Sequence, residues 1–479
     1  MRPDGPLWSW SAAETTSALR DGATSATAVA EAVLARIAAV DGAVGAFVEV
    51  DPAGIRAAAD LADRRYAEGT AGPLCGVPVS IKDLHPVRGM HTTYGGPQSP
   101  GCPDQEDDLV VSRLRQAGAL IVGKTLSPEQ GCSYSSMASD GRMTRNPWQL
   151  SHGAGGSSSG AAAAVAAGMG PLALGSDGAG SIRLPAALCG VVGYKPSYGR
   201  VPAYPVSDPF SLSRVHIGPL ARTVADAALF TAVVQGADQR DPHSWSDEQA
   251  LSPLTELPAP EARRLRMAWC AAPQGTTPDA EVVGLVAQAV KELGTALNCE
   301  VVQREPEWHD APKIQRILWD GSYAMRYPPE IPLHPATPDA LVRMIERGRR
   351  LSLADLGAAS RARTALFHRI NRFFADFDIF VTPTCTVAGW PVTAPLGLGP
   401  NDDHPLQAGR TVYPFNLTGH PSISMPAGFT SAGLPVGVQL TAGWRQDDTL
   451  LRVAATFERL RRWPELWPDA TALSSSAGL

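Results

Sequence analysis

Apolar residues recur along the first part of the chain with the period of a helix. Four aliphatic residues, from Val29 to Val40, fall at positions i, i+4, i+8 and i+11, so the region 11–45 is predicted to be helical. A different pattern follows at 76–83, "GVPVSIKD", where apolar residues alternate with others. Alternation with a period of two predicts a strand, and Lys82 lies near its end.

Strand-like and helix-like segments then alternate along the chain, which predicts an α/β fold with a layered sheet covered on both faces. Strands near both ends of the sequence indicate one extended sheet and a single large domain over 1–479. The stretch 300–350, rich in proline and aromatic residues, is predicted to be irregular. The predicted helices are 107–117, 158–167 and 218–234. The predicted strands are 119–123, 171–176, 190–196, 265–270, 378–383, 422–429 and 435–442.

Composition narrows the classes of function. The chain has 479 residues, of which 44% are hydrophobic and 18% charged, enough apolar material for a large core. Its formal net charge of −6 disfavours nucleic acid as a partner. The sequence has no signal-peptide pattern and no run of about 18 apolar residues, so we expect a cytoplasmic protein without a membrane span. Seven widely spaced cysteines favour free thiols over a disulfide framework or a zinc site.

A stretch rich in glycine and serine, "GAGGSSSGAAAAVAAG" at 153–168, is the first candidate for chemistry. A linker is disfavoured, because the serines run directly into alanines that favour a helix. A phosphate-binding loop is disfavoured too, because Ser158 stands where a dinucleotide fingerprint needs its last glycine, and the lysine of a P-loop is missing. Ser158 is also the centre of a G-x-S-x-G motif. The polar segment before it, however, is not the buried strand that a nucleophile elbow requires.

A second serine, Ser181, follows in "DGAGSIRL" and is predicted to lie close to the first group. A helix of about 15 Å over 158–167 leads away from Ser158, and a strand of roughly 16–20 Å over 171–176 leads back. A turn then places Ser181 near the N-terminus of that helix, where free N–H groups and positive potential gather.

A serine nucleophile needs a base, and no histidine-centred triad is evident in the sequence. Only five of the 41 basic residues are lysines. Lys82, at the end of the predicted strand 76–83, can serve as the base if burial lowers its pKa. Its neighbour Asp83 projects to the opposite face of that strand and does not hold the amine in its charged form.

These motifs, in this order, resemble the amidase signature family. The similarity covers roughly 10–240 and 370–460, with a signature core at about 76–206. It implies an α/β/α arrangement around an extended mixed, twisted β-sheet, and hydrolysis of an amide bond without a cofactor or a metal ion. The segments that carry the resemblance are "GVPVSIKD", "GALIVGKT", "TRNPW", "GGSSSG", "LGSDGAGSIRLPAALCGVVGYKPSYGRV", "GPLARTVADAAL" and "FNLTGHPSISMPAGF".

The resemblance implies a relay of protons between two serines and a lysine. Ser181 matches the family's nucleophile, Ser157 the serine that follows a cis peptide bond, and Lys82 the lysine of "SIKD". It also implies an oxyanion hole made by backbone N–H groups, and side chains that support the site. The oxyanion-hole residues are Gly178, Ala179 and Gly180 with the N–H of Ser181, and the supporting residues are Ser158, Asp177 and Arg183.

Two further features bear on the substrate. Ala179 stands where the family usually has a glycine, and alanine tolerates positive φ poorly. The segment 131–134 tends to line the acyl pocket in the family. Aromatic residues in 300–350, Trp319 among them, form either a mobile cover over an apolar substrate or ordinary core. The candidate substrate-binding residues are Gly131, Cys132, Ser133, Tyr134 and Trp319.

Few charges are expected in this pocket, so we predict hydrolysis of neutral aryl or alkyl amides by a monomer or homodimer. Carbamates (urethanes) and cyclic or oligomeric amides are further candidates. An alternative is the amidase subunit of glutamyl-tRNA amidotransferase, which shares the signature. A third is a binding protein without catalysis, which the presence of all three relay residues disfavours.

Overall fold

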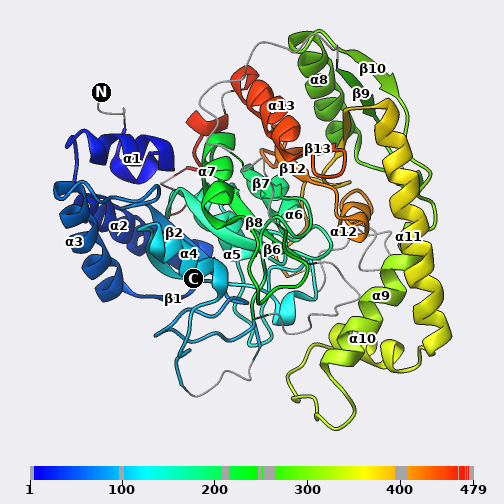
Figure 1. Cartoon of the computed structure of the whole chain (residues 1–479), viewed down its shortest axis with the longest axis horizontal. Helices are drawn as coiled ribbons and strands as arrows, with labels where there is room; N and C mark the ends of the chain where they lie inside the picture. Colours follow the sequence, from blue (N-terminus) through cyan, green and yellow to red (C-terminus); the bar gives the residue numbers. More distant parts are fainter. Residues whose placement is uncertain are drawn as a thin grey trace.

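Eleven strands form one sheet that joins the two halves of the chain (Figure 1). The computed structural model describes residues 5–96, 102–205, 215–245, 251, 265–393, 408–461, 463–469, 471 and 473. In sheet order the strands are β1 (Phe47–Val50), β3 (Leu120–Thr125), β2 (Pro78–Lys82), β6 (Leu172–Asp177), β8 (His216–Ala221), β7 (Val192–Lys195), β12 (Ser422–Phe429), β13 (Pro435–Ala442), β11 (Ile379–Pro383), β9 (Arg266–Trp269) and β10 (Glu300–Gln303).

The sheet is mixed. Strand β2 is parallel to its neighbours β3 and β6, and β9 is parallel to β10 and β11. The six other pairs of neighbours are antiparallel. A separate hairpin, β4 (Arg145–Asn146) with β5 (Gln149–Gly153), precedes the glycine- and serine-rich stretch. The predicted α/β fold with one extended mixed sheet is confirmed.

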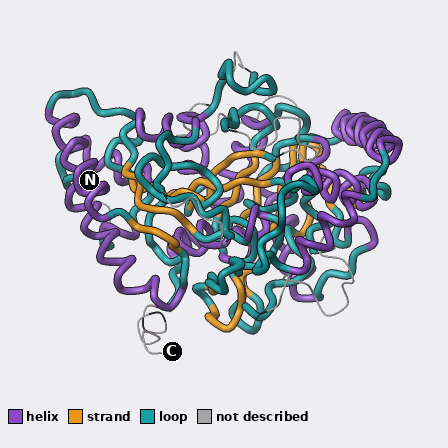
Figure 2. Tube along the Cα trace, turned by 90° about the horizontal axis from the view of Figure 1, so that it is seen from below, coloured by secondary structure: helices purple, strands orange, loops and turns teal. Residues whose placement is uncertain are grey.

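Helices lie on both sides of the sheet (Figure 2). Serine side chains fix several helix starts; Ser11 and Ser352, for example, each form a capping box. The helices are α1 (Ala12–Arg20), α2 (Ala26–Val44), α3 (Pro52–Ala67), α4 (Leu109–Gln116), α5 (Ser159–Ala166), α6 (Arg183–Cys189), α7 (Val224–Val234), α8 (Ala280–Ala296), α9 (Ala311–Arg326), α10 (Asp339–Arg349), α11 (Leu353–Asp376), α12 (Pro414–Thr418) and α13 (Asp447–Leu460).

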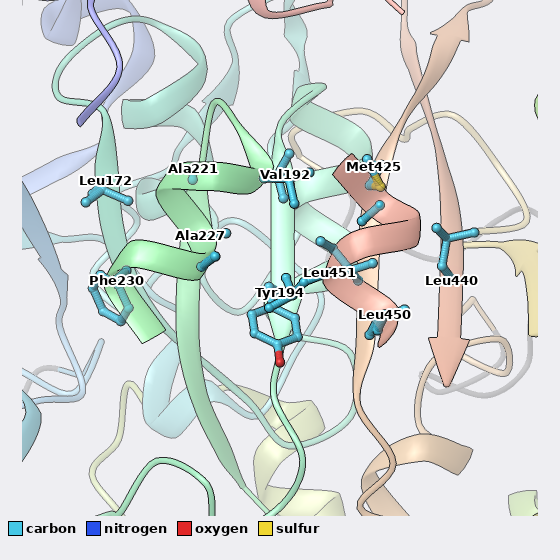
Figure 3. Packing of buried hydrophobic residues seen from close by; sticks show 14 of the residues in the cluster. Leu172, Val192, Tyr194, Ala221, Ala227, Phe230, Met425, Leu440, Leu450 and Leu451 are labelled. Atoms are coloured by element: carbon cyan, nitrogen blue, oxygen red, sulfur yellow. The ribbon is translucent and has the colours of Figure 1, made fainter. Parts of the chain in front are cut away.

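Alternate residues of a strand point to different helices, as the period of two requires. In β6, Leu172 and Leu174 belong to the core shared with α4, α7, α8 and α13, whereas Ala173 belongs to the core shared with α2, α5 and α6. Figure 3 shows the first of these cores, with Phe230 of α7 and Leu450 of α13 near Tyr194 of β7. A third cluster joins α9, α10 and α11 to β9 and β11.

The structure corrects three predictions of local structure. The helical region 11–45 is two helices, because Ser25 caps a new helix after a turn. Residues 218–221 belong to β8 rather than to a helix, which begins only after the N-cap Thr223. The stretch 300–350 is not irregular: it contains β10, α9 and α10. No helix in the described part of the chain has the length and hydropathy needed to cross a bilayer.

Candidate active site

Lys82 is the last residue of β2 and is completely buried. Its Nζ donates to Ser157 Oγ at 2.8 Å. It also donates to Ser176 Oγ at 3.1 Å and to the Ser176 carbonyl oxygen at 3.2 Å. Strand β2 lies beside β6, which carries Ser176, so the sheet itself places the amine between the two serines.

Burial lowers the pKa of Lys82 to about 7, although the negative charge of Asp177 acts in the opposite direction. The adjacent carboxylate, Asp83, pairs instead with the buried Lys124 at 3.2 Å. A lysine with such a pKa is largely neutral at or just above pH 7. It can therefore accept a proton from a hydrogen-bonded serine.

The second group of the relay lies in the turn that leads into α5. The peptide bond between Gly156 and Ser157 is cis. A Cβ at Gly156 would lie 2.4 Å from the carbonyl oxygen of Ser135, so only glycine fits there. The next residue, Ser158, is the N-cap of α5; its Oγ donates to the Ser176 carbonyl at 3.3 Å.

Ser181 lies close to this turn. The N–H of Ser158 donates to the carbonyl oxygen of Ser181 at 3.1 Å. Helix α5 leads away from Ser158, β6 returns, and the turn 178–181, here called the oxyanion turn, carries Ser181 back to the start of α5. Ser157 and Ser181 both line a cavity of about 380 Å³, together with Ser176 and Gly178.

The oxyanion turn presents free backbone donors. The N–H groups of Gly178, Ala179 and Ser181 donate to no acceptor among the described residues. The N–H of Gly180, in contrast, donates to Asp177 Oδ1 at 2.6 Å, which argues against the predicted role of Gly180 in the oxyanion hole. Ala179 does not have positive φ, so its side chain causes no backbone strain; Gly180 has φ of +112°.

A buried ion pair supports the oxyanion turn from behind. Arg183 Nε lies 3.0 Å from Asp177 Oδ2, and both side chains are completely buried. Arg183 also donates to Gln439 Oε1 at 2.7 Å, and Asn416 Nδ2 donates to Asp177 Oδ1 at 2.7 Å. Burial alone would raise the pKa of Asp177, but the Arg183 guanidinium and the hydrogen bonds hold it well below its usual range. Asp177 therefore stays charged.

The candidate substrate-binding residues divide into two sets. Gly131 and Trp319 line the cavity. Cys132, Ser133 and Tyr134 are buried but do not line the cavity formed by the described residues, so their prediction as substrate contacts is not supported. Tyr134 instead fixes the oxyanion turn, because its Oη donates to the Ala179 carbonyl oxygen at 2.7 Å.

Sequence reasoning missed most of the wall that α9 contributes. Ser322, Tyr323 and Arg326 line the cavity beside Trp319. They fall at i, i+3, i+4 and i+7, the spacing of one helix face, which is the signal that could have identified them. It was missed because 300–350 was predicted to be irregular.

Comparison with known proteins places this site in a family. The sequence profile of the family named Amidase matches residues 28–451. The chain belongs to the amidase signature family. An acylamidase from Rhodococcus erythropolis is 36% identical to this amidase over 468 residues, which cover 96% of this chain and 97% of the relative.

Two further relatives span this amidase almost completely. The amidase-type subunit of the glutamyl-tRNA(Gln) amidotransferase of Roseiflexus castenholzii is 34% identical over 514 residues, which cover 98% of this chain and 100% of the relative. The crystal structure of a bacterial aryl acylamidase of the amidase signature family has a TM-score of 0.86 at 28% identity, with 98% of this chain and 99% of that chain covered. The protein is therefore a hydrolase that acts on the C–N bond of amides.

Proposed function

We propose that this amidase hydrolyses small carboxamides through an acyl-enzyme on Ser181. The hydrogen bond from Lys82 Nζ to Ser157 Oγ, at 2.8 Å, carries the proposal. It joins a buried lysine, whose pKa is lowered to about 7, to a serine in the cavity that also contains Ser181. A base, a relay and a nucleophile are thus within one site.

The proposed reaction has two stages. In the first, Lys82 takes the proton of Ser157 while Ser157 takes that of Ser181, and Ser181 Oγ attacks the carbonyl carbon. The C–N bond then breaks, and the amine leaves with a proton that Lys82 returns through Ser157. In the second stage, water attacks the acyl-enzyme with the same relay as base. The carboxylic acid is released and Ser181 regains its proton.

The oxyanion of the tetrahedral intermediate needs donors that are free before the reaction begins. We assign this role to the N–H groups of Gly178, Ala179 and Ser181. The N–H of Gly180 has its acceptor in Asp177 and orients the turn instead. Asp177 and Arg183 act as positioning residues, because they contact the turn and not the cavity.

Aromatic side chains in the lining, Trp319, Tyr323 and Tyr198, favour aryl or alkyl groups beside the scissile bond. Carbamates fit the same attack, because their carbonyl carbon also bears a nitrogen leaving group. The prediction of a neutral substrate depended on a pocket with few charges. Arg326 and Asp241 are two of several charged residues in the lining, so neutrality is not part of the proposal.

The proposal is tested with purified protein and a panel of anilides, p-nitroanilides and aryl carbamates. We expect turnover of several of them, and a covalent acyl adduct on the peptide that contains Ser181, detected by mass spectrometry. A Ser181→Ala variant that keeps wild-type turnover would overturn the assignment.

The second candidate is the glutaminase role of an amidotransferase component, which the full-length similarity to the Roseiflexus protein favours. In that case the chain would release ammonia from glutamine and would be inactive on the anilide panel. Glutamine is therefore included in the panel, and ammonia is measured with and without added partner proteins.

A further inference from the structure

Arg326 is the last residue of α9 and lies half-buried in the wall of the cavity that contains Ser157 and Ser181. Its guanidinium stands over the ring of Tyr323, with Cζ 5.2 Å from the ring centroid. Its Nε is buried and has no hydrogen-bond partner among the described residues. Within the described chain, no carboxylate lies within ion-pair distance of this guanidinium.

Three other arginines of the protein show the usual pairing with a carboxylate. Arg183 pairs with Asp177 at 3.0 Å and Arg200 with Asp447 at 3.1 Å. Arg240, which also lines the cavity, pairs with Asp238 through two hydrogen bonds of 2.9 and 3.0 Å. Arg326 is therefore a cation of the cavity whose charge is not balanced by a carboxylate of the described residues.

Contacts connect Arg326 to the reacting groups. Tyr323, the residue beneath its guanidinium, donates from Oη to the Gln130 carbonyl oxygen at 3.0 Å. The next residue, Gly131, lies so close to the relay that a Cβ there would be 3.1 Å from Ser157 Oγ. Arg326 thus belongs to the wall that continues directly from Ser157.

The acid nearest along this wall does not neutralise Arg326. Glu129 accepts hydrogen bonds from Ser139 and, at 3.5 Å, from Tyr327. Burial raises the pKa of Glu129, although these two hydrogen bonds act against the shift. The local field at the guanidinium is therefore positive.

We propose that Arg326 binds a carboxylate carried by the substrate, and that it makes this enzyme selective for amides with such a group at a distance from the scissile bond. The inference rests on the proposed hydrolysis at Ser181. A planar guanidinium matches a carboxylate through two parallel hydrogen bonds, and a half-buried position strengthens them. The carboxylate belongs either to the acyl chain or to the leaving amine.

Two pairs of substrates separate these sources. Glutaryl p-nitroanilide is compared with pentanoyl p-nitroanilide for the acyl side, and 4-acetamidobenzoate with 4-acetamidobenzamide for the amine side. We expect the wild type to prefer the carboxylate in one pair by about tenfold or more in kcat/KM, the range of a charge-assisted hydrogen bond. In Arg326→Gln this ratio should fall to about one, whereas Arg326→Lys should retain part of it.

Arg316→Gln is the matched control, because Arg316 is an exposed arginine of the same helix that does not line the cavity. The ratio should stay at its wild-type value in this variant. Thermal unfolding of all variants shows whether they are folded.

Binding gives a readout that is independent of turnover. The preferred carboxylate ligand is titrated by calorimetry into Ser181→Ala and into the double variant with Arg326→Gln. We expect at least about tenfold weaker binding in the double variant. Equal kcat/KM within both pairs, or a preference and affinity that persist in Arg326→Gln, would overturn the inference while the proposed hydrolysis stands. Loss of the Ser181 adduct would overturn the proposed function instead.

Discussion

The pH dependence of kcat/KM tests the assignment of Lys82 as the base. Burial lowers the pKa of this lysine from 10.5 to about 7. Only the neutral amine can accept a proton from Ser157, so the rate should follow the neutral fraction. That fraction is about one half at pH 7, roughly a tenth at pH 6 and roughly a hundredth at pH 5. We expect a plateau above about pH 8 and a fall of about tenfold per pH unit below about pH 6.

The assay measures kcat/KM for one p-nitroanilide in buffers of constant ionic strength. Circular dichroism at each pH separates loss of the base from loss of the fold. Glu458 supplies a control, since burial raises its pKa to about 7 and it would titrate in the same range. It lies on α13, accepts the Val224 N–H at 2.8 Å and does not line the cavity.

The expected profile of Glu458→Gln is therefore the same as that of the wild type. A flat profile between about pH 5 and pH 8 in a folded protein would refute Lys82 as the base. An acid limb that moves in Glu458→Gln would assign the limb to another titration.

The remaining predictions concern the oxyanion turn and the two serines. Ser181→Ala should abolish turnover and the covalent adduct, and Ser157→Ala should lower kcat by about three orders of magnitude or more, both measured with a p-nitroanilide. Gly180→Ala should lower both Tm and kcat, because its Cβ would lie 2.2 Å from Val412 Cγ2 at a φ of +112°; Val412→Ala as a second change should restore space but not the backbone conformation. Tyr134→Phe should cost about 1 kcal/mol in unfolding free energy and lower kcat, because the turn loses a hydrogen bond of 2.7 Å; an unchanged kcat would show that this bond does not orient the donors.

The path from Ser158 to Ser181 could be predicted because each step depends on local chemistry. Alanines favour the helix, glycines allow the reversal after it, and apolar residues of β6 fit a buried strand. The element lengths then bring the two serines together. Lys82 could be placed near them only by family resemblance, because the pairing of β2 with β6 is a long-range contact that no local pattern encodes.

The wall formed by α9 could not be predicted in the same way. Its apolar face packs against α10, α11 and β11 rather than on the sheet centre, and Pro312 near its start is compatible with either a helix or a loop. The engagement of the Gly180 N–H by Asp177 was equally inaccessible. It depends on the orientation of one carboxylate, which Arg183 and Asn416 fix from elements far apart in the sequence.

The same burial that makes Lys82 reactive also lowers the stability of the fold. A fall of the pKa from 10.5 to about 7 corresponds to about 5 kcal/mol against folding at pH 7, because the unfolded chain binds a proton that the native site holds poorly. This contribution is largest below about pH 7 and disappears as pH rises to 10.5. Activity also rises as pH increases through 7. Protonation of Lys82 therefore opposes catalysis and native stability in the same direction, and the hydroxyl of Ser176, at 3.1 Å from Nζ, helps to satisfy the buried amine.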